Sequence, residues 1–338
     1  MRFSLKALTA LALTTTTLVG CGAAGSPMGL GHYRTMSRFG GLGVSPYSLW
    51  VLPDQGDGPV LQAINSAQKS IQLEDYMFTL GGASGPVAQA LIAKARAGVD
   101  VRVILDRAPY GGHNPNPATA QALQAGGVQC QTSSPAFTYT HEKSMVVDGQ
   151  VAVVMTFNMT NAGVASNREY GVVDTNPQDV ADISNVFVAD WNRAPVTVSA
   201  PNLVVSPINS RAKILALIDS AQSSILLEDE ELNDPIVAQH LGAKAKAGVN
   251  VRVEVANGTS NAATQQLLAS NGVTQFETMT SHYLHAKAIV VDGNRAYVGS
   301  ENMSSTSLDK NREMGLILTD PACVSTLAST LNQDWQTR

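Results

Sequence analysis

The chain has 338 residues, of which 44% are hydrophobic and 14% charged, and its formal net charge is −5 at pH 7. This length and hydrophobic content suffice for one large or two medium folded domains and exclude an intrinsically disordered protein. The sparse, slightly acidic charge offers no broad basic surface, which weighs against a dedicated nucleic-acid-binding protein but leaves room for a local basic pocket.

The first twenty residues have the composition of an export signal. Arg2 and Lys6 give a positive start, and the apolar, threonine-rich stretch 7–20 is too short to span a bilayer. Small residues then precede Cys21, which resembles a bacterial lipoprotein signal, in which the cysteine becomes the lipidated first residue. A plain secretory signal cleaved near Ala23 is the alternative. Both interpretations predict export; the first predicts a lipid anchor at Cys21, in the periplasm or at the cell surface.

The signal peptide (1–20) is followed by residues 21–46, which are rich in Gly, Ser and Met and are expected to form a flexible tether. We divide the rest of the chain into two copies of one unit, residues 47–195 and 203–338. The join between them contains proline and no charge, as is typical of a linker.

An internal repeat supports this division. VAQALIAKARAGVDVRV (87–103) and VAQHLGAKAKAGVNVRV (237–253) agree at thirteen of seventeen positions, and INSAQKSIQLED (64–75) corresponds to IDSAQSSILLED (218–229). Two lobes that pack against each other are the natural architecture for such a tandem repeat. We expect the lobes to be related by pseudo-twofold symmetry.

Each copy alternates helix and strand. In the first copy, apolar residues at helical spacing predict a helix over 87–97, which Gly98 ends. Alternation over 99–105 predicts a half-buried strand, and a short helix near 118–124 precedes another strand through Cys130. The pattern indicates an α/β fold.

Two segments carry the reactive side chains. THEKSMVVDGQ places His141 two residues before Lys143, and LHAKAIVVDGN places His285 two residues before Lys287. Because residues two apart on a strand share a face, we expect each pair to point together. The Asp-Gly that follows is typical of a tight hairpin turn. Asp148 and Asp292 fall on the opposite face at that spacing, so we predict that they form turns or structural hydrogen bonds.

A third feature recurs at a fixed distance. Glu169, in SNREYGVV, lies 28 residues after His141, and Glu313, in KNREMGLI, lies 28 residues after His285. A carboxylate that binds one ring nitrogen fixes the tautomer and leaves the other nitrogen free to attack or to donate a proton. We predict this orienting role for both glutamates. The alternative is a solvated surface carboxylate beside the preceding arginine.

The pattern His-x-Lys-x(4)-Asp therefore begins at His141 and again at His285. This duplicated motif resembles the signature of the phospholipase D superfamily, and the repeat covers nearly all of the chain behind the signal. The resemblance implies two tandem phospholipase D-like α-β-α lobes with one active site at their interface.

The family pattern continues into Gly-Ser-x-Asn, which the second half matches with Gly299, Ser300 and Asn302. The first half keeps Asn158 but has Met155 and Thr156 in place of Gly and Ser. Threonine still offers a hydroxyl. Met155 predicts a less close approach between backbone and phosphate on that side.

The resemblance also implies a mechanism. One imidazole attacks phosphorus and forms a phosphohistidine, while the other protonates the leaving oxygen and later activates water or an alcohol. We favour His141 as the nucleophile and His285 as the acid. The non-bridging oxygens would be held by Lys143, Lys287, Asn158 and Asn302. Because these groups offset the charge without a metal ion, we expect neither a metal nor another cofactor.

The leading functional hypothesis is a monomeric phospholipase D-type phosphodiesterase or phosphatidyltransferase that acts on glycerophospholipids. One alternative is a secreted or periplasmic nuclease of the same superfamily, although nucleic acid is the less favoured substrate. A second is a weakly catalytic, membrane-tethered module that binds phospholipid, for which the altered Met155-Thr156 site is the only support.

Other residues leave open choices. Cys130 and Cys323 either pair or remain separate thiols. The acidic pairs Glu74-Asp75 and Glu228-Asp229 line the shared site or have structural roles. The loop 107–117 is a candidate substrate-facing loop or a plain connection. His282 and His285 have His-x-x-His spacing, but opposite faces of a strand disfavour a metal site there.

Overall fold

The computed structural model describes residues 45–337; the predicted signal, Cys21 and the predicted tether up to residue 44 lie outside the described residues. Export and the lipid anchor therefore stay predictions. Within the described part of the chain, none of the helices combines the length and apolar character needed to cross a bilayer.

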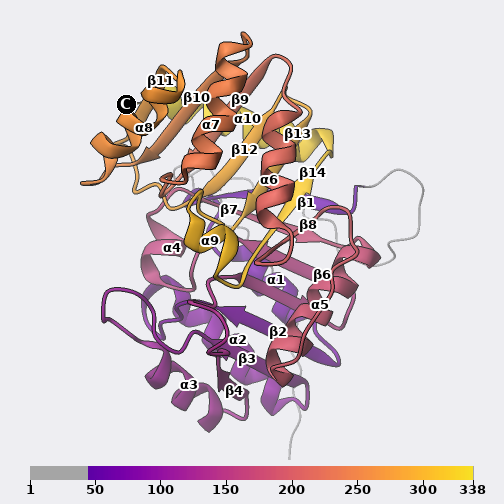
Figure 1. Ribbon diagram of the computed structural model, residues 1–338. Coiled ribbons are helices and arrows are strands. Elements are labelled where there is room, and N and C mark those ends of the chain that lie inside the picture. Colours follow the sequence, from indigo (N-terminus) through magenta and orange to yellow (C-terminus); the bar gives the residue numbers. More distant parts are fainter. Residues whose placement is uncertain (1–44, 338) are drawn as a thin grey trace, which may run out of the picture. The chain divides into compact units, whose positions relative to one another are not determined.

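Two seven-stranded mixed sheets with the same strand order form the framework (Figure 1). The first sheet has the order β1-β7-β6-β5-β2-β3-β4 and the second the equivalent order β8-β14-β13-β12-β9-β10-β11. The strands of the first sheet are β1 Tyr47–Leu52, β2 Ser70–Asp75, β3 Asp100–Leu105, β4 Gln129–Thr132, β5 Lys143–Val147, β6 Val151–Met155 and β7 Glu169–Asp174. Those of the second are β8 Leu203–Ser206, β9 Ser224–Asp229, β10 Asn250–Ala256, β11 Gln275–Met279, β12 Lys287–Val291, β13 Arg295–Gly299 and β14 Glu313–Leu318.

Helices cover both faces of each sheet. The helices of the first half are α1 Gly58–Ser66, α2 Gly85–Arg96, α3 Asn116–Ala125, α4 Asn161–Ala165 and α5 Pro177–Asn192, with a 3₁₀ turn at Gly82–Ser84. Those of the second are α6 Ser210–Asp219, α7 Pro235–Lys246, α8 Asn261–Asn271, α9 Ser305–Asp309 and α10 Pro321–Gln336. The predicted α/β fold of two equivalent lobes is confirmed.

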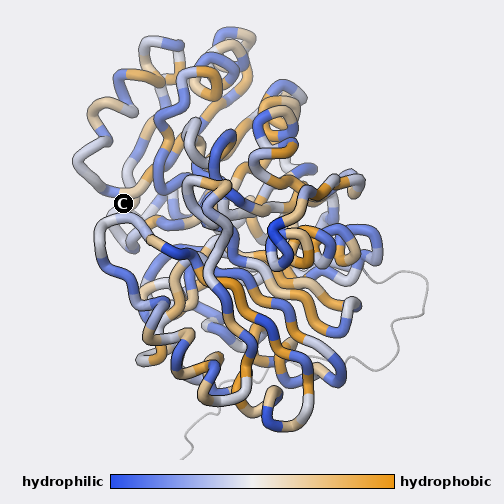
Figure 2. Tube along the Cα trace, turned by 60° about the horizontal axis from the view of Figure 1, so that its bottom comes forward, coloured by the Kyte–Doolittle hydropathy of each residue, from blue (hydrophilic) through white to orange (hydrophobic). Residues whose placement is uncertain are grey.

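Three apolar cores hold these layers together. One lies between the first sheet and α1–α3, and a second lies between the second sheet and α6–α8. The third contains side chains of both sheets and of α5 and α10, so it joins the two halves. Figure 2 shows hydrophobic residues concentrated along the strands and hydrophilic ones in the connections. Burial of these faces is the main force that fixes one lobe against the other.

The local predictions for the first repeat hold with small shifts at the ends. The helix expected at 87–97 is α2, and Gly98 follows it with a φ of 91°, the left-handed conformation that ends a helix. The expected strands are β3 and β4. Cys130 and Cys323 are free thiols that belong to different cores, so they do not pair.

Candidate active site

The two histidines lie just before the central strands β5 and β12, where each half of the chain meets the other. The strands begin at Lys143 and Lys287, so the expectation that the histidines lie within these strands is wrong. The backbone N–H of His141 donates to the carbonyl of Arg312, at 2.8 Å, and that of His285 donates to the carbonyl of Arg168, at 3.3 Å. The backbone of each half therefore fixes the histidine of the other.

The glutamates also cross between halves. The Nδ1 atom of His141 lies 2.8 Å from Oε2 of Glu313, in hydrogen-bonding geometry. The Nδ1 atom of His285 lies 2.7 Å from Oε1 of Glu169, without the same alignment. Both carboxylates are fully buried, which excludes the alternative of a solvated surface carboxylate. The identical spacing along the chain thus places each glutamate against the histidine of the opposite half.

Polar side chains hold each glutamate in place. Glu169 accepts hydrogen bonds from Thr156 Oγ1, at 2.6 Å, and Asn167 Nδ2, at 3.4 Å. Glu313 accepts them from Ser307 Oγ, at 2.5 Å, and Asn311 Nδ2, at 2.9 Å. The threonine that replaces the family serine in the first half therefore still supplies a hydroxyl to the site.

Ser300, its counterpart, has a backbone role. Its Oγ accepts the N–H of Met314, at 3.0 Å, directly beside Glu313. Thr156 Oγ1 accepts the N–H of Tyr170 in the same way, at 2.9 Å. Each hydroxyl thus fixes the strand that carries an orienting glutamate.

The side chain of Met155 points away from Thr156. It is buried in the outer core of the first half, on the face of β6 opposite to Thr156. In the second half Tyr297 fills the equivalent core, and a Cβ at Gly299 would overlap the Tyr297 hydroxyl and the Cα of Gly315. The difference between Met155 and Gly299 therefore follows the packing of the two cores, and a less close approach of a phosphate on that side stays a prediction.

The two lysines are fully buried beside their histidines. Nζ of Lys143 donates to the carbonyl of His141 and Nζ of Lys287 to that of His285, both at 2.5 Å. Burial lowers the pKa of Lys143 to about 8, against the opposing effect of Glu313. Burial also acts on Lys287, but the carboxylates of Glu230 and Glu169 outweigh it and raise its pKa. Both ammonium groups can balance an anionic substrate near neutral pH.

The imidazole of His141 is neutral at physiological pH. Burial lowers its pKa to about 4, and the nearby charge of Lys143 adds to this effect, while Glu313 opposes it. Because Glu313 binds Nδ1, the favoured tautomer keeps its proton there and leaves Nε2 with a free lone pair. The charge of Lys287 also lowers the pKa of His141, as expected if both halves contribute to one site.

The two asparagines offer unused polar atoms. Oδ1 of Asn158 and Oδ1 of Asn302 are buried without a hydrogen-bond partner in the described residues. Asp75 and Asp229, whose role was left open, hold the next residue of each loop: their Oδ2 atoms accept the N–H of Met159, at 3.1 Å, and of Met303, at 2.8 Å. These aspartates therefore position the asparagines.

The aspartates of the family motif lie away from the histidines, in the turns between β5 and β6 and between β12 and β13. Asp148 has a φ of 54° and Asp292 a φ of 51°, and each is followed by a glycine at 65°. Asp148 accepts the N–H groups of residues 68–70, and Asp292 those of residues 222–224. Each carboxylate thus ties a hairpin turn to the start of the neighbouring central strand.

One acidic side chain of the site was not predicted. Glu230, directly after β9, has Oε2 at 2.8 Å from Lys287 Nζ and at 3.5 Å from His285 Nε2. Its counterpart in the first half is Tyr76, whose ring centroid lies 4.4 Å from that of His141. The available signal was a break in the repeat, because LEDY in the first copy is answered by LEDE in the second.

Three buried carboxylates, Glu74, Glu142 and Asp190, have oxygens within 4.8 Å of one another. Arg312 occupies this cluster: its Nε lies 2.7 Å and its Nη2 3.1 Å from the two oxygens of Asp190. Burial raises the pKa of Glu142 to about 7, with the charge of Asp190 adding to it. A guanidinium and bound protons therefore supply the positive charge, and we assign no metal to the cluster.

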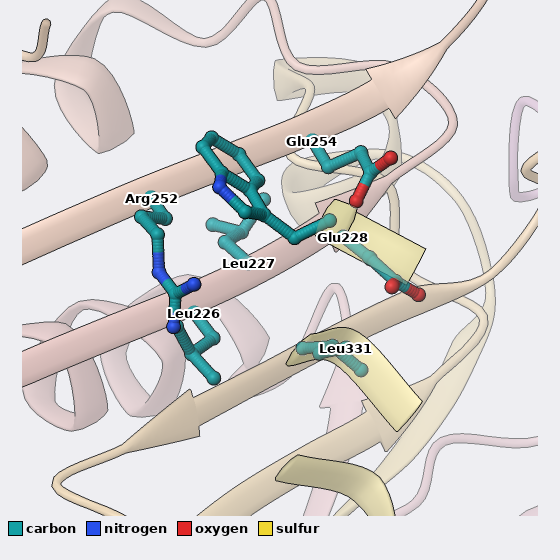
Figure 3. Close-up of a pocket in the computed structure, with 7 residues that line it drawn as sticks. Leu226, Leu227, Glu228, Arg252, Glu254 and Leu331 are labelled. Carbon is teal, nitrogen blue, oxygen red and sulfur yellow. The ribbon is translucent and has the colours of Figure 1, made fainter. Parts of the chain in front are cut away.

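A small cavity lies between β9, β10 and α10, lined by Glu228, Arg252, Glu254 and apolar side chains (Figure 3). Its volume of about 10 Å³ admits at most one water molecule. It is no substrate site.

In this arrangement two histidines with crossed carboxylates lie beside two buried lysines, between two equivalent lobes. A family model described as "Cardiolipin synthase, PLD-like domain" matches residues 60–191 and 214–335. The chain belongs to this family, and so to the phospholipase D superfamily.

Individual known proteins are also similar to this chain in sequence or in structure. A cardiolipin synthase of Oceanobacillus iheyensis is 24% identical over 320 residues, which cover 81% of this chain and 65% of that protein. The chain thus spans less than two thirds of this relative. A phosphatidylserine synthase of Haemophilus influenzae superposes with a TM-score of 0.63 at 12% identity, over 87% of this chain and 86% of that one. A polyphosphate kinase of Porphyromonas gingivalis superposes with a TM-score of 0.66 at 17% sequence identity, over 85% of this chain and 50% of that one. At these identities the two structures show the fold alone.

Proposed function

We propose that the chain is a phospholipase D-type phosphatidyltransferase that moves the phosphatidyl group of a glycerophospholipid to an alcohol or to water. The observation that carries this proposal is the pair of crossed His–Glu contacts beside two buried lysines. Family membership and relatives that are cardiolipin synthases favour a lipid over nucleic acid. The net charge of −5 points the same way.

The residues support a two-step reaction. In the first step, Nε2 of His141 attacks phosphorus, the bond from phosphorus to the headgroup oxygen breaks, and His285 gives that oxygen a proton. In the second, an alcohol or water loses its proton to His285 as its oxygen attacks phosphorus, and the phosphorus–nitrogen bond breaks to restore His141. Lys143, Lys287 and the asparagine side chains offset the charge of the non-bridging oxygens, so the residues of the site can supply the electrostatic stabilisation.

A direct assay separates lipid from nucleic-acid chemistry. The full chain is incubated in EDTA with phosphatidylglycerol vesicles and, separately, with plasmid DNA. We expect headgroup release from the vesicles and intact plasmid. Cleavage of DNA alone would identify a nuclease. Lipid turnover that occurs without EDTA and is lost in its presence would contradict a metal-independent reaction. Tight vesicle binding without turnover would identify a binding module.

The pH dependence of kcat/KM is expected to have two limbs. Activity falls as the pH drops through about 4, because His141 gains a proton and loses its nucleophilic lone pair. It falls again as the pH rises through about 8, because Lys143 loses its charge. A Lys143→Arg variant keeps its charge at all these pH values. We expect its alkaline limb to move upward, and an unchanged limb would show that another group titrates there.

A further inference from the structure

The two sides of the active site differ in chemistry although the lobes share one fold. On the side of His141, Tyr76 packs edge-on against the imidazole and 5.9 Å from the ring of Tyr139, and Lys143 Nζ lies 5.2 Å from the Tyr76 ring. On the side of His285, the equivalent position holds Glu230. The first side is therefore aromatic and the second acidic and polar.

Glu230 is a fixed hydrogen-bond acceptor. Besides its contact with Lys287, its Oε1 accepts the hydroxyl of Tyr283 at 2.9 Å. Burial would raise the pKa of Glu230, but the positive charges of His285 and Lys287 outweigh burial and hold the pKa well below the usual range. The carboxylate is thus ionised at neutral pH and can only accept hydrogen bonds.

A pocket of about 500 Å³ lies next to this side of the site, because Tyr283, which binds Glu230, and Asn167, which binds Glu169, both line it. The rest of its lining is Ser166, Asn257, Thr280, Ser281 and His282, together with the apolar Met279. Through these two glutamates, Tyr283 and Asn167 each lie one contact away from His285. Hydroxyl and amide groups suit a hydroxyl-rich ligand, whereas they offer little to an acyl chain.

The mechanism assigns the same side to the alcohol. His285 exchanges a proton with the headgroup that leaves and with the acceptor that enters, so both oxygens must reach its Nε2 atom. When His285 is neutral and Glu169 binds its Nδ1 atom, the Nε2 atom of His285 is a hydrogen-bond acceptor. Oε2 of Glu230, which can only accept hydrogen bonds, lies 3.5 Å from this Nε2 atom. Two adjacent acceptors match an alcohol that presents two neighbouring hydroxyl donors.

We propose that the pocket beside His285 binds the alcohol partner of the reaction, and that Glu230 selects alcohols with vicinal hydroxyls by accepting the second hydroxyl while His285 takes the proton of the first. This rests on the proposed function. The bonds made and broken remain those of the second step, and Glu230 keeps its charge throughout.

The test compares two alcohols that differ by one hydroxyl. The full chain reacts with a phosphatidyl-p-nitrophenol donor in the presence of 1,2-propanediol or 1-propanol, and the lipid products are quantified. We expect the diol to be preferred at least about tenfold, as a hydrogen bond to a charged group provides. Glu230→Gln should reduce the preference, measured as the ratio of the two lipid products, to about twofold or less. The control Glu231→Gln, at the exposed neighbour, should keep it.

The outcomes are distinguishable. No nitrophenol release by the unchanged chain would refute the proposed function itself. Release with equal use of both alcohols, or a preference that survives Glu230→Gln, would refute only the role of Glu230. A selective loss of choline transfer in Glu230→Gln, with diol preference intact, would show that the carboxylate recognises a cation instead.

Discussion

A His141→Asn variant is expected to lose about 10⁴-fold or more of its kcat/KM for lipid, since removal of a covalent nucleophile leaves only binding and electrostatic stabilisation. His141 is singled out by its pKa of about 4 and its aligned hydrogen bond to Glu313, which together leave a neutral nitrogen free to attack. Headgroup release from phosphatidylglycerol vesicles measures the loss. The control is His240→Asn, because His240 lies on α7 and, among the acidic groups of residues 45–337, pairs with Asp219 alone.

A comparison with His285→Asn orders the two histidines. With phosphatidyl-p-nitrophenol, the leaving group departs as an anion and needs no acid, so His285→Asn should release a burst of one nitrophenolate per chain and then turn over slowly. Because phosphohistidine is acid-labile, the intermediate is trapped by alkaline quenching and detected by intact mass. His141→Asn should give no burst. A burst in His141→Asn and none in His285→Asn would reverse the assignment.

The sequence predicts the lobes and their turns well because these depend on local patterns. Alternation over 99–105 becomes β3, and the Asp-Gly pairs at 148–149 and 292–293 form the expected turns with positive φ. Two copies of one pattern also predict two equivalent sheets. Each of these features is decided by residues close together in the chain.

The partners within the site could not be predicted in the same way. The 28-residue spacing relates Glu169 to His141 along the chain, but the carboxylate meets His285 because Arg168, just before β7, pairs with Leu284, just before His285. Chain distance does not say which half faces which. The repeat does not predict Glu230 either, because the two copies differ at this position: the first copy has Tyr76 where the second has Glu230.

The crossed arrangement also depends on a buried ion pair at each lobe boundary. Arg312 on the second half pairs with Asp190 of α5 and donates to the carbonyl of Ser206, at 3.0 Å. Arg168 on the first half donates to Asp334 of α10, at 3.0 Å. Each arginine directly precedes an orienting glutamate and accepts, through its carbonyl, the N–H of the opposite histidine. The pairs therefore couple lobe docking to the geometry of the site.

An Arg312→Ala variant is expected to lose about 3–5 kcal/mol of its free energy of unfolding, because it leaves Asp190, Glu142 and Glu74 buried without their cation. Urea denaturation at pH 8 measures this loss. Arg96→Ala, at an exposed arginine in the last turn of α2, is the control and should cost a few tenths of a kcal/mol, or about 1 kcal/mol at most.

The loss should depend on pH in a defined direction. Burial raises the pKa of Glu142 from 4.5 to about 7 in the folded chain even with Arg312 present, and removal of Arg312 raises it further. A carboxyl whose folded pKa lies above its unfolded value contributes most to stability below the unfolded pKa, and this contribution disappears as the pH rises through the folded one. Arg312→Ala should therefore be much less harmful near pH 4.5 than at pH 8. A loss of unfolding free energy below about 1 kcal/mol that is equal at both pH values would contradict this prediction. It would show that the three carboxyl groups do not need the positive charge of Arg312.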